Sequence, residues 1–135
     1  MAVFEKEFED KNICLNIECC EDIKFNGWKQ DINTIIVNLL DNSLFWIVEK
    51  DCTEREIFIV TNKTSSGFTI DYTDSGPGIN NELLESGVIF EPEFTTKPHG
   101  TGLGLSIAGE AATRNGLTLI AVQREKGAHF VLSAE

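Results

Sequence analysis

The chain carries near its middle the stretch GFTIDYTDSGPG, residues 67–78. Its first part alternates apolar and polar side chains, and this period of two predicts a half-buried strand over residues 67–73. Asp74 follows, and then Gly76 and Gly78, two glycines that permit backbone angles avoided by other residues. A carboxylate at such a turn can accept a hydrogen bond from an exocyclic amine, although the same pattern is common in plain turns. The stretch therefore predicts a strand that ends at a glycine-rich corner carrying an acid.

Strand and helix patterns continue on both sides of this corner. Period-two alternation predicts further strands at residues 13–19, 56–61, 117–123 and 128–133. Helical periodicity predicts helices at residues 30–49 and 103–114, the second ending at Asn115-Gly116. The apolar face of the first helix comprises Ile32, Ile36, Leu39, Leu40, Ser43 and Ile47. Turn residues at 65–67 and 126–127 predict hairpins. This order favours a layer of helices on a mixed sheet.

Two asparagines stand on the first predicted helix, in the segment NLLDN at residues 38–42. Asn38 and Asn42 are four residues apart, so their side chains lie about 40° apart around the axis, on the flank of the apolar face. A carboxamide oxygen suits a hard cation such as magnesium, which takes few protein ligands. Taken alone, both asparagines are also consistent with a solvated helix surface.

A second glycine-rich segment, GTGLGL at residues 100–105, leads into the second predicted helix. Free amides and the helix dipole at a helix N-terminus favour anions. The segment is not a P-loop, because no Gly-Lys-Ser/Thr follows it, and a flexible loop before a helix is the plain alternative. Residues 79–99 have weak periodicity, with a short helical piece near 81–85. A loop of this length is usually functional, and it predicts a lid.

The bulk composition limits the class of protein. At 135 residues the chain is expected to form one domain with a real core. It has no apolar run near the roughly 18 residues of a membrane span, so this segment is not expected to insert into a membrane. The net charge of −11 argues against a nucleic-acid binder. It also means that a bound polyphosphate would need a cation and oriented backbone amides.

The cysteines Cys14, Cys19, Cys20 and Cys52 form no CxxC pair, and only two histidines accompany them. A zinc site or a disulfide framework is therefore not expected, and reduced thiols in a cytoplasmic domain are the better interpretation.

Taken together, these segments resemble the ATP-binding domain shared by gyrase, heat-shock chaperones, histidine kinases and MutL, and most closely its histidine-kinase branch. Residues 38–43 match the N box of that family, and residues 74–79 match its first glycine box. Residues 90–97, FEPEFTTK, match its phenylalanine-containing lid motif, and residues 100–105 match its second glycine box. The resemblance covers nearly the whole chain.

The resemblance implies an α/β fold: a two-layer sandwich with a mixed, largely antiparallel sheet, about three helices on one face and a long ATP lid. It implies ATP and Mg²⁺ as ligands. Asp74 would bind the adenine amino group, Gly76, Gly78 and Ile79 would complete that corner, and Asn42 would ligate magnesium.

The remaining residues of the implied site would surround the phosphates. Asn38 would line the phosphate pocket, and Lys97 would reach the terminal phosphate from the lid. The amides of the second glycine box would contact the phosphates through Gly100, Thr101, Gly102, Leu103 and Gly104.

One position separates the branches of this family. ATP-hydrolysing members carry a glutamate, acting as general base, four residues before the metal-binding asparagine. Here that position is Asn38, which cannot accept a proton at neutral pH. The resemblance therefore favours a protein-histidine kinase over an ATP-hydrolysing machine.

Three features depart from the family pattern. Phe45 and Trp46 replace a lysine and a tyrosine that many histidine kinases carry, so a phosphate contact is missing or is taken over by Lys97. Trp46 is expected to pack rather than to stack on a base. Neither His99, in the lid, nor His129, on a strand, lies on a helix beside an acid, so no acceptor histidine is assigned.

The expected unit is thus a single domain, residues 1–135, without its acceptor and dimerisation domain. Its expected partners are ATP, a histidine-containing dimerisation domain in the same or another chain, and a downstream response regulator. The expected location is the cytoplasm, including the cytoplasmic part of a membrane sensor. The alternative is a stand-alone, nucleotide-dependent interaction module without kinase activity.

Overall fold

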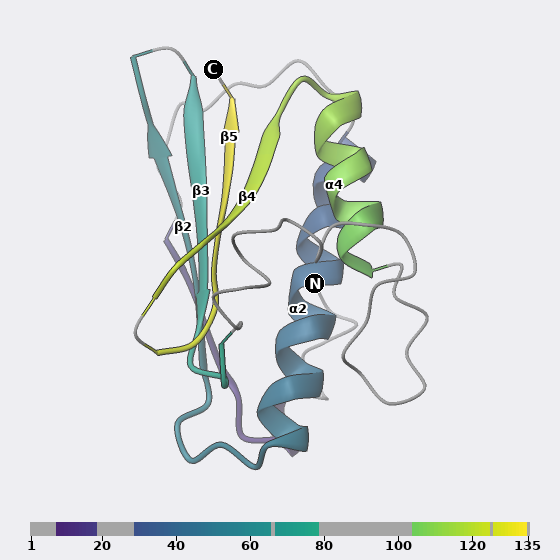
Figure 1. The fold of residues 1–135 in the computed structure, drawn as a ribbon. Helices are drawn as coiled ribbons and strands as arrows, with labels where there is room; N and C mark the ends of the chain where they lie inside the picture. The colour runs from purple at the N-terminus through teal and green to yellow at the C-terminus, as the bar shows by residue number, and fades with distance from the viewer. Residues whose placement is uncertain (1–7, 19–28, 66, 79–103, 125, 135) are drawn as a thin grey trace.

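The elements lie where the sequence patterns place them. The computed structural model describes residues 8–18, 29–65, 67–78, 104–124 and 126–134 (Figure 1). The predicted lid and the helical piece at 81–85 lie outside these ranges. Five strands and two helices have defined bounds: β1 Cys14–Glu18, α2 Lys29–Glu49, β2 Glu56–Lys63, β3 Phe68–Asp74, α4 Gly104–Arg114, β4 Thr118–Val122 and β5 His129–Ala134.

The strands form one mixed sheet in the order β1-β2-β3-β5-β4. Only β1 and β2 pair in parallel, and the other three pairs are antiparallel. The predicted hairpin turn between β2 and β3 is closed by a hydrogen bond from the amide of Thr64 to the carbonyl of Gly67, 2.9 Å long. A Cβ on Gly67 would lie 1.9 Å from the carbonyl oxygen of Ala134, so only glycine allows the strands to pair here.

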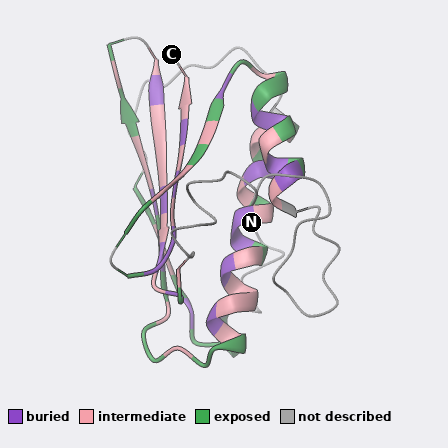
Figure 2. Cartoon of the chain, in the orientation of Figure 1, coloured by how far each residue is buried: buried purple, intermediate pink, exposed green. Residues whose placement is uncertain are grey.

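The molecule has two layers, with α2 and α4 side by side on one face of the sheet (Figure 1). Figure 2 shows buried residues along the surfaces on which helices and sheet meet. The fully buried core joins all of these elements and includes Ile35, Leu39, Leu40, Ile47, Ile57, Tyr72, Ala108, Ala111 and Phe130. The α/β fold with a helix layer on a mixed, largely antiparallel sheet is therefore confirmed.

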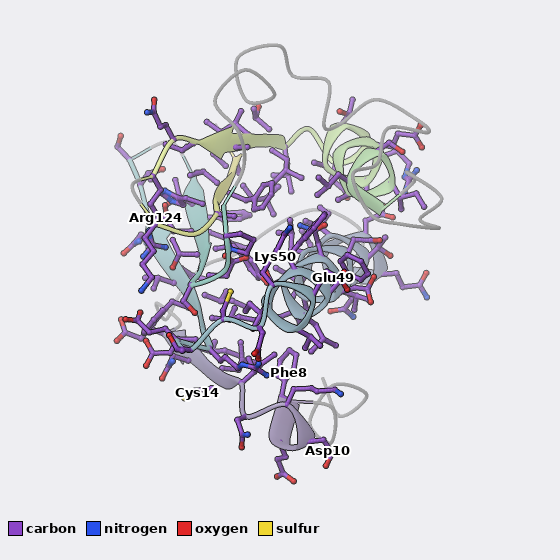
Figure 3. All side chains as sticks on the ribbon, turned by 60° about the horizontal axis from the view of Figure 1, so that its bottom comes forward. Phe8, Asp10, Cys14, Glu49, Lys50 and Arg124 are labelled. Atoms are coloured by element: carbon purple, nitrogen blue, oxygen red, sulfur yellow. The ribbon has the colours of Figure 1, made fainter. Side chains whose placement is uncertain are left out.

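A short helical segment at residues 8–10 adds to the core from the N-terminal side. Figure 3 shows Phe8 pointing from this segment toward α2, whereas Asp10 points away. Phe8 is buried and belongs to the core cluster. No helix in the described parts of the chain is long and apolar enough to cross a membrane.

The buried face of α2 is wider than its apolar periodicity indicated. Ile35, which the predicted face omits, is fully buried, whereas Ile32 and Ile36 are only partly buried. The cause is α4. Ile35 lies one turn after Asp31, and Asp31 accepts a hydrogen bond from Arg114 at the end of α4, 2.8 Å long. The flank of α2 that turns toward α4 is therefore covered as well as the side that faces the sheet.

Asp31 also fixes the direction in which the two helices pack. It lies in the first turn of α2 and contacts Arg114 in the last turn of α4, so the helices run antiparallel. Asn115 donates a second hydrogen bond to the same carboxylate, 2.8 Å long. The hydrogen bond from Arg114 is the main reason that the pKa of Asp31 lies below its ordinary value.

Candidate functional site

Asp74 is the most constrained polar side chain of the predicted site. It ends β3 and is only 5% exposed. Its Oδ1 accepts hydrogen bonds from the amides of Gly76 and Ala128, both 3.0 Å long. Its Oδ2 accepts a hydrogen bond from the hydroxyl of Ser43, 2.5 Å long. Each carboxylate oxygen has two lone pairs, so Oδ1 is saturated, and Oδ2 retains one acceptor position that no described residue occupies.

A hydrogen-bonded chain connects this carboxylate to the interior of α2. The Tyr72 hydroxyl lies 2.7 Å from Ser43 Oγ and 3.0 Å from the carbonyl oxygen of Leu39. Ser43 must donate its only proton to Asp74, because a carboxylate can only accept. Tyr72 must therefore donate toward Ser43 or Leu39. Both residues are only 1% exposed, and burial raises the pKa of Tyr72 well above its ordinary value of 10.0.

The backbone around Asp74 is held by neighbouring strands. Its amide donates to the carbonyl of Ala128, 3.0 Å away, and the amide of Ser75 donates to Glu56, also 3.0 Å away. Gly127 has a φ of 78°, and a Cβ there would lie 1.8 Å from the carbonyl oxygen of Asp74. The turn before β5 can therefore approach Asp74 only because residue 127 is a glycine.

The predicted glycine corner continues to the end of the described segment. Gly76 is buried and lies against Ile47 of α2, and Gly78 has a φ of 82°. A Cβ on Gly78 would lie 2.9 Å from the carbonyl oxygen of Gly127. The corner thus packs closely on the turn before β5, so a side chain at Gly78 would be disfavoured by both space and backbone angle.

The two asparagines lie on the half-buried flank of α2, as their spacing predicted. The side-chain amide of Asn38 donates to the carbonyl of Thr34 in the same helix, 2.8 Å away. The side chain of Asn42 has no hydrogen-bond partner within the described residues. Ser43 follows Asn42 directly. One turn of α2 therefore carries both a carboxamide on its flank and the hydroxyl that anchors Asp74.

The N-terminus of α4 lies close to this turn of α2. Asp31 meets Arg114, and the helices are antiparallel. Ten residues separate Arg114 from Gly104 (114 − 104), and ten separate Asp31 from Asp41 (41 − 31), which is about 15 Å along each helix. Gly104 is therefore roughly level with Asp41 and Asn42. An anion at the free amides of α4 would lie near the Asn42 carboxamide.

Phe45 and Trp46, the two residues that depart from the family pattern, pack on each other. The rings of Phe45 and Trp46 meet edge to face with centroids 5.0 Å apart. The Lys50 ammonium lies over the Trp46 ring, 5.8 Å from its centroid, a cation–π geometry. Both aromatic side chains are half-buried. Trp46 thus has packing partners in its own helix, in the role expected for it.

His129 lies on the other face of the sheet. Along β3 and β5, Tyr72 and Phe130 are buried on the helix side, and Asp71 and His129 alternate with them. His129 Nε2 lies 2.8 Å from Asp71 Oδ1, and both side chains are partly exposed. His129 is a strand surface residue paired with an acid on its neighbouring strand.

The structure gathers the described candidates around one end of α2, and the others lie outside the described residues. Those outside are Ile79, Lys97, His99, Gly100, Thr101, Gly102 and Leu103. The sequence did not indicate the roles of Tyr72, Gly127 and Ala128 in holding Asp74. One signal was available: Ser43 is a polar residue on an otherwise apolar helix face, and such a residue needs a buried partner.

Comparisons with known proteins show which family the chain is similar to. Residues 29–135 match the family model described as histidine kinase-, DNA gyrase B-, and HSP90-like ATPase. The sensor histidine kinase ZraS of Escherichia coli O157:H7 is 42% identical over 77 residues, 56% of this chain and 16% of that protein. The histidine protein kinase SaeS of Staphylococcus aureus is 34% identical over 119 residues, 83% of this chain and 33% of that protein. The chain thus spans a third or less of these relatives.

Solved structures of histidine kinases share the fold of this chain. The nucleotide-free catalytic domain of the histidine kinase ThkA has a TM-score of 0.79 and 30% identity, covering 97% of this chain and 84% of that chain. ThkA in complex with the response regulator protein TrrA has a TM-score of 0.75 and 28% identity, covering 97% of this chain and 36% of that one.

Proposed function

Because the chain belongs to the histidine kinase-, DNA gyrase B- and HSP90-like ATPase family, and resembles histidine-kinase catalytic domains within it, we propose that it is the catalytic domain of a two-component sensor histidine kinase. It binds Mg-ATP and donates the γ-phosphate to a histidine on a separate helical dimerisation domain. Residues 1–135 act as one ATP-binding domain, on the cytoplasmic side of the membrane where the sensor is a membrane protein. A response regulator receives the phosphate downstream.

The observation that carries this proposal is the hydrogen-bonding state of Asp74. Its carboxylate is buried and has one acceptor position left, on Oδ2. The 6-amino group of adenine is a donor of the right kind for that position. Gly76 and Gly78 lie in the turn beside it and would let the base approach the backbone closely, and we propose that Ile79 completes the adenine corner. The residues present therefore fit an adenine.

The phosphate end of the site also has donors of suitable chemistry. The Asn42 carboxamide, free of partners in the described parts, suits magnesium, and Asn38, on the same flank of α2, would line the phosphate pocket. The first turn of α4 at Gly104 offers amides to a phosphate, together with Gly100, Thr101, Gly102 and Leu103, and Lys97 adds a positive charge from the lid. Magnesium, when bound, offsets charge on the phosphate oxygens.

The chain contributes binding and positioning rather than acid–base chemistry. Asn38, at the position of a general base in hydrolysing relatives, cannot take a proton from water. An imidazole nitrogen needs no such base, because its lone pair is already available to attack phosphorus. A new P–N bond forms as the bond to the bridging oxygen breaks, and ADP leaves. Alignment of the two reactants supplies most of the catalysis.

The test is nucleotide binding followed by transfer in trans. We expect the chain to bind Mg-ATP by calorimetry and to phosphorylate a separately purified helical dimerisation domain of a sensor histidine kinase. Asp74→Asn keeps the shape but turns a donor toward the adenine amine, and it should weaken ATP binding by about tenfold to a hundredfold. Asp71→Asn, on the opposite face of the same strand, is the matched control and should bind normally.

The second candidate is a nucleotide-dependent interaction module that does not transfer phosphate. Phe45 favours it, because this aromatic replaces a lysine and packs on Trp46. Asn42→Ala separates the two functions. A kinase should lose phosphotransfer along with its metal ligand. If the Asn42→Ala variant still binds ATP and still regulates its partner, the chain is a binding module, and metal-dependent phosphotransfer is not its function.

A further inference from the structure

The hydrogen-bonded chain behind Asp74 has a fixed direction, and this direction bears on which base the site accepts. Ser43 donates its proton to Asp74, so the proton in the 2.7 Å contact between Tyr72 and Ser43 must come from Tyr72. The carbonyl oxygen of Leu39, 3.0 Å away, is a second and more distant acceptor for this same proton. Since the carboxylate cannot donate, neither hydroxyl can reverse its role. The protons of both hydroxyls are therefore used within this network, and neither is available to a ligand.

We propose that Ser43 and Tyr72 are positioning residues that set base selectivity, by holding the last open acceptor of Asp74 in one direction. The inference rests on the proposed function and assigns residues that do not themselves touch the base. With Oδ1 bound by two backbone amides and Oδ2 by Ser43, the carboxylate cannot rotate without breaking a bond. A purine with a 6-amino group meets an aligned acceptor. A purine with a 6-oxo group meets a lone pair facing a lone pair.

Removing the Ser43 hydroxyl should change the affinity for 6-amino purines and the affinity for 6-oxo purines in opposite directions. Oδ2 then has no protein donor, and the carboxylate is held only through Oδ1. A 6-amino purine loses the alignment of its acceptor. A 6-oxo purine gains, because the carboxylate can turn away and relieve the repulsion. If the role of Ser43 were merely structural, its substitution would instead weaken the binding of both nucleotides by the same factor.

Tyr72 acts on the carboxylate only through Ser43. Its hydroxyl polarises the Ser43 O–H bond and strengthens the hydrogen bond to Asp74 by a modest amount, roughly 10–30%. Tyr72→Phe should therefore produce a smaller change in selectivity than Ser43→Ala. In a chain that lacks the Ser43 hydroxyl, removing the Tyr72 hydroxyl should have no further effect on selectivity. The two substitutions are therefore expected to be non-additive.

The experiment compares ATP with ITP, which differs from ATP only at the 6-position group and the adjoining ring proton. Binding of each Mg-nucleotide is measured by calorimetry for the wild-type chain, Ser43→Ala, Tyr72→Phe and the double variant. We expect the ATP:ITP affinity ratio to fall by about tenfold in Ser43→Ala. A fall of about twofold is expected in Tyr72→Phe. The double variant should equal Ser43→Ala.

The outcomes separate this inference from the proposed function. If the wild-type chain binds no ATP, the proposed function fails. If it binds ATP and Ser43→Ala leaves the ratio unchanged, or the two substitutions multiply, the inference is overturned and the function stands. Tyr72→Phe is nearly isosteric, so it keeps the test valid even if Ser43→Ala destabilises the fold, which thermal unfolding of each variant would reveal.

Discussion

At the scale of single residues, the burial of Asp74 decides what the corner can do. A buried carboxylate without partners is costly, and here three donors come from three places: the turn after β3, the residue before β5, and α2. The carboxylate is therefore aimed before any ligand arrives. Preorganisation of this kind reduces the cost of binding, because little remains to be ordered.

Tyr72 gives this buried network a pH signature. Burial raises its pKa in the folded state above the ordinary value near 10. Below about pH 10 both states hold the phenol proton, so its stabilising effect is fully present. Above that pH the unfolded chain loses the proton first, and stability falls by about 1.4 kcal/mol per pH unit. Urea unfolding between about pH 9 and pH 11 should show this slope, and Tyr72→Phe should remove it.

The sequence contains a single tyrosine, so the ultraviolet absorbance of tyrosinate reports on Tyr72 alone. In the native protein this absorbance should stay low well past the pH at which an exposed tyrosine titrates. Tyrosinate that forms in the folded chain near pH 10 would mean that the hydroxyl is not buried between α2 and β3.

At the scale of elements, the turns decide where helices and strands stop. Helix α4 ends with the amide of Leu117 bonded to Ala112 and that of Gly116 bonded to Thr113, with Gly116 at a φ of 70°. This is the Schellman arrangement that the predicted Asn115-Gly116 stop implies. Helix α2 ends in the same way, with the amide of Cys52 bonded to Ile47 and that of Asp51 bonded to Val48, but here the residue with the positive φ, 46°, is Asp51. A non-glycine residue at that position left no glycine signal in the sequence.

Two glycines with similar backbone angles provide a matched test of the close approach to Asp74. Gly116→Ala adds a Cβ that meets nothing within 4 Å, so it should cost only the strain of a left-handed alanine, about 1–2 kcal/mol. Gly127→Ala carries the same strain and also places a Cβ 1.8 Å from the carbonyl of Asp74. It should therefore destabilise more and displace the carboxylate.

Urea unfolding and ATP titration of both variants measure these effects separately. Gly116→Ala should keep normal ATP affinity, because it lies far from the corner at the other end of α4. Gly127→Ala should weaken ATP binding even where the chain remains folded. Equal losses in the two variants would mean that the turn before β5 does not position Asp74.

At the scale of the whole molecule, local patterns predicted more of the fold than of the site. The strands and both helices follow short-range periodicity, and their bounds agree with the predictions to within a residue or two at most ends. Ile35 was missed because its burial depends on α4, a contact that periodicity within α2 cannot reveal. Ser43 and Asp74 are 31 residues apart, and Ala128 is 54 residues beyond Asp74. Only the packed sheet brings such partners together.

The charge of the whole molecule leads us to predict that ATP binding at the proposed site depends on magnesium. The chain has a net charge of −11, so metal-free ATP meets a surface of its own sign. Removing magnesium with EDTA should weaken ATP binding by at least about tenfold, while adenosine, which lacks phosphates, should bind equally with and without the metal. Asn42→Ala should reproduce the loss for ATP, and EDTA should then have little further effect. Calorimetry of the wild-type chain and of Asn42→Ala, each in magnesium and in EDTA, measures all four combinations.

An ATP affinity of the wild-type chain that is the same in both buffers would show that Asn42 and magnesium do not hold the phosphates, even if Asp74 binds the base.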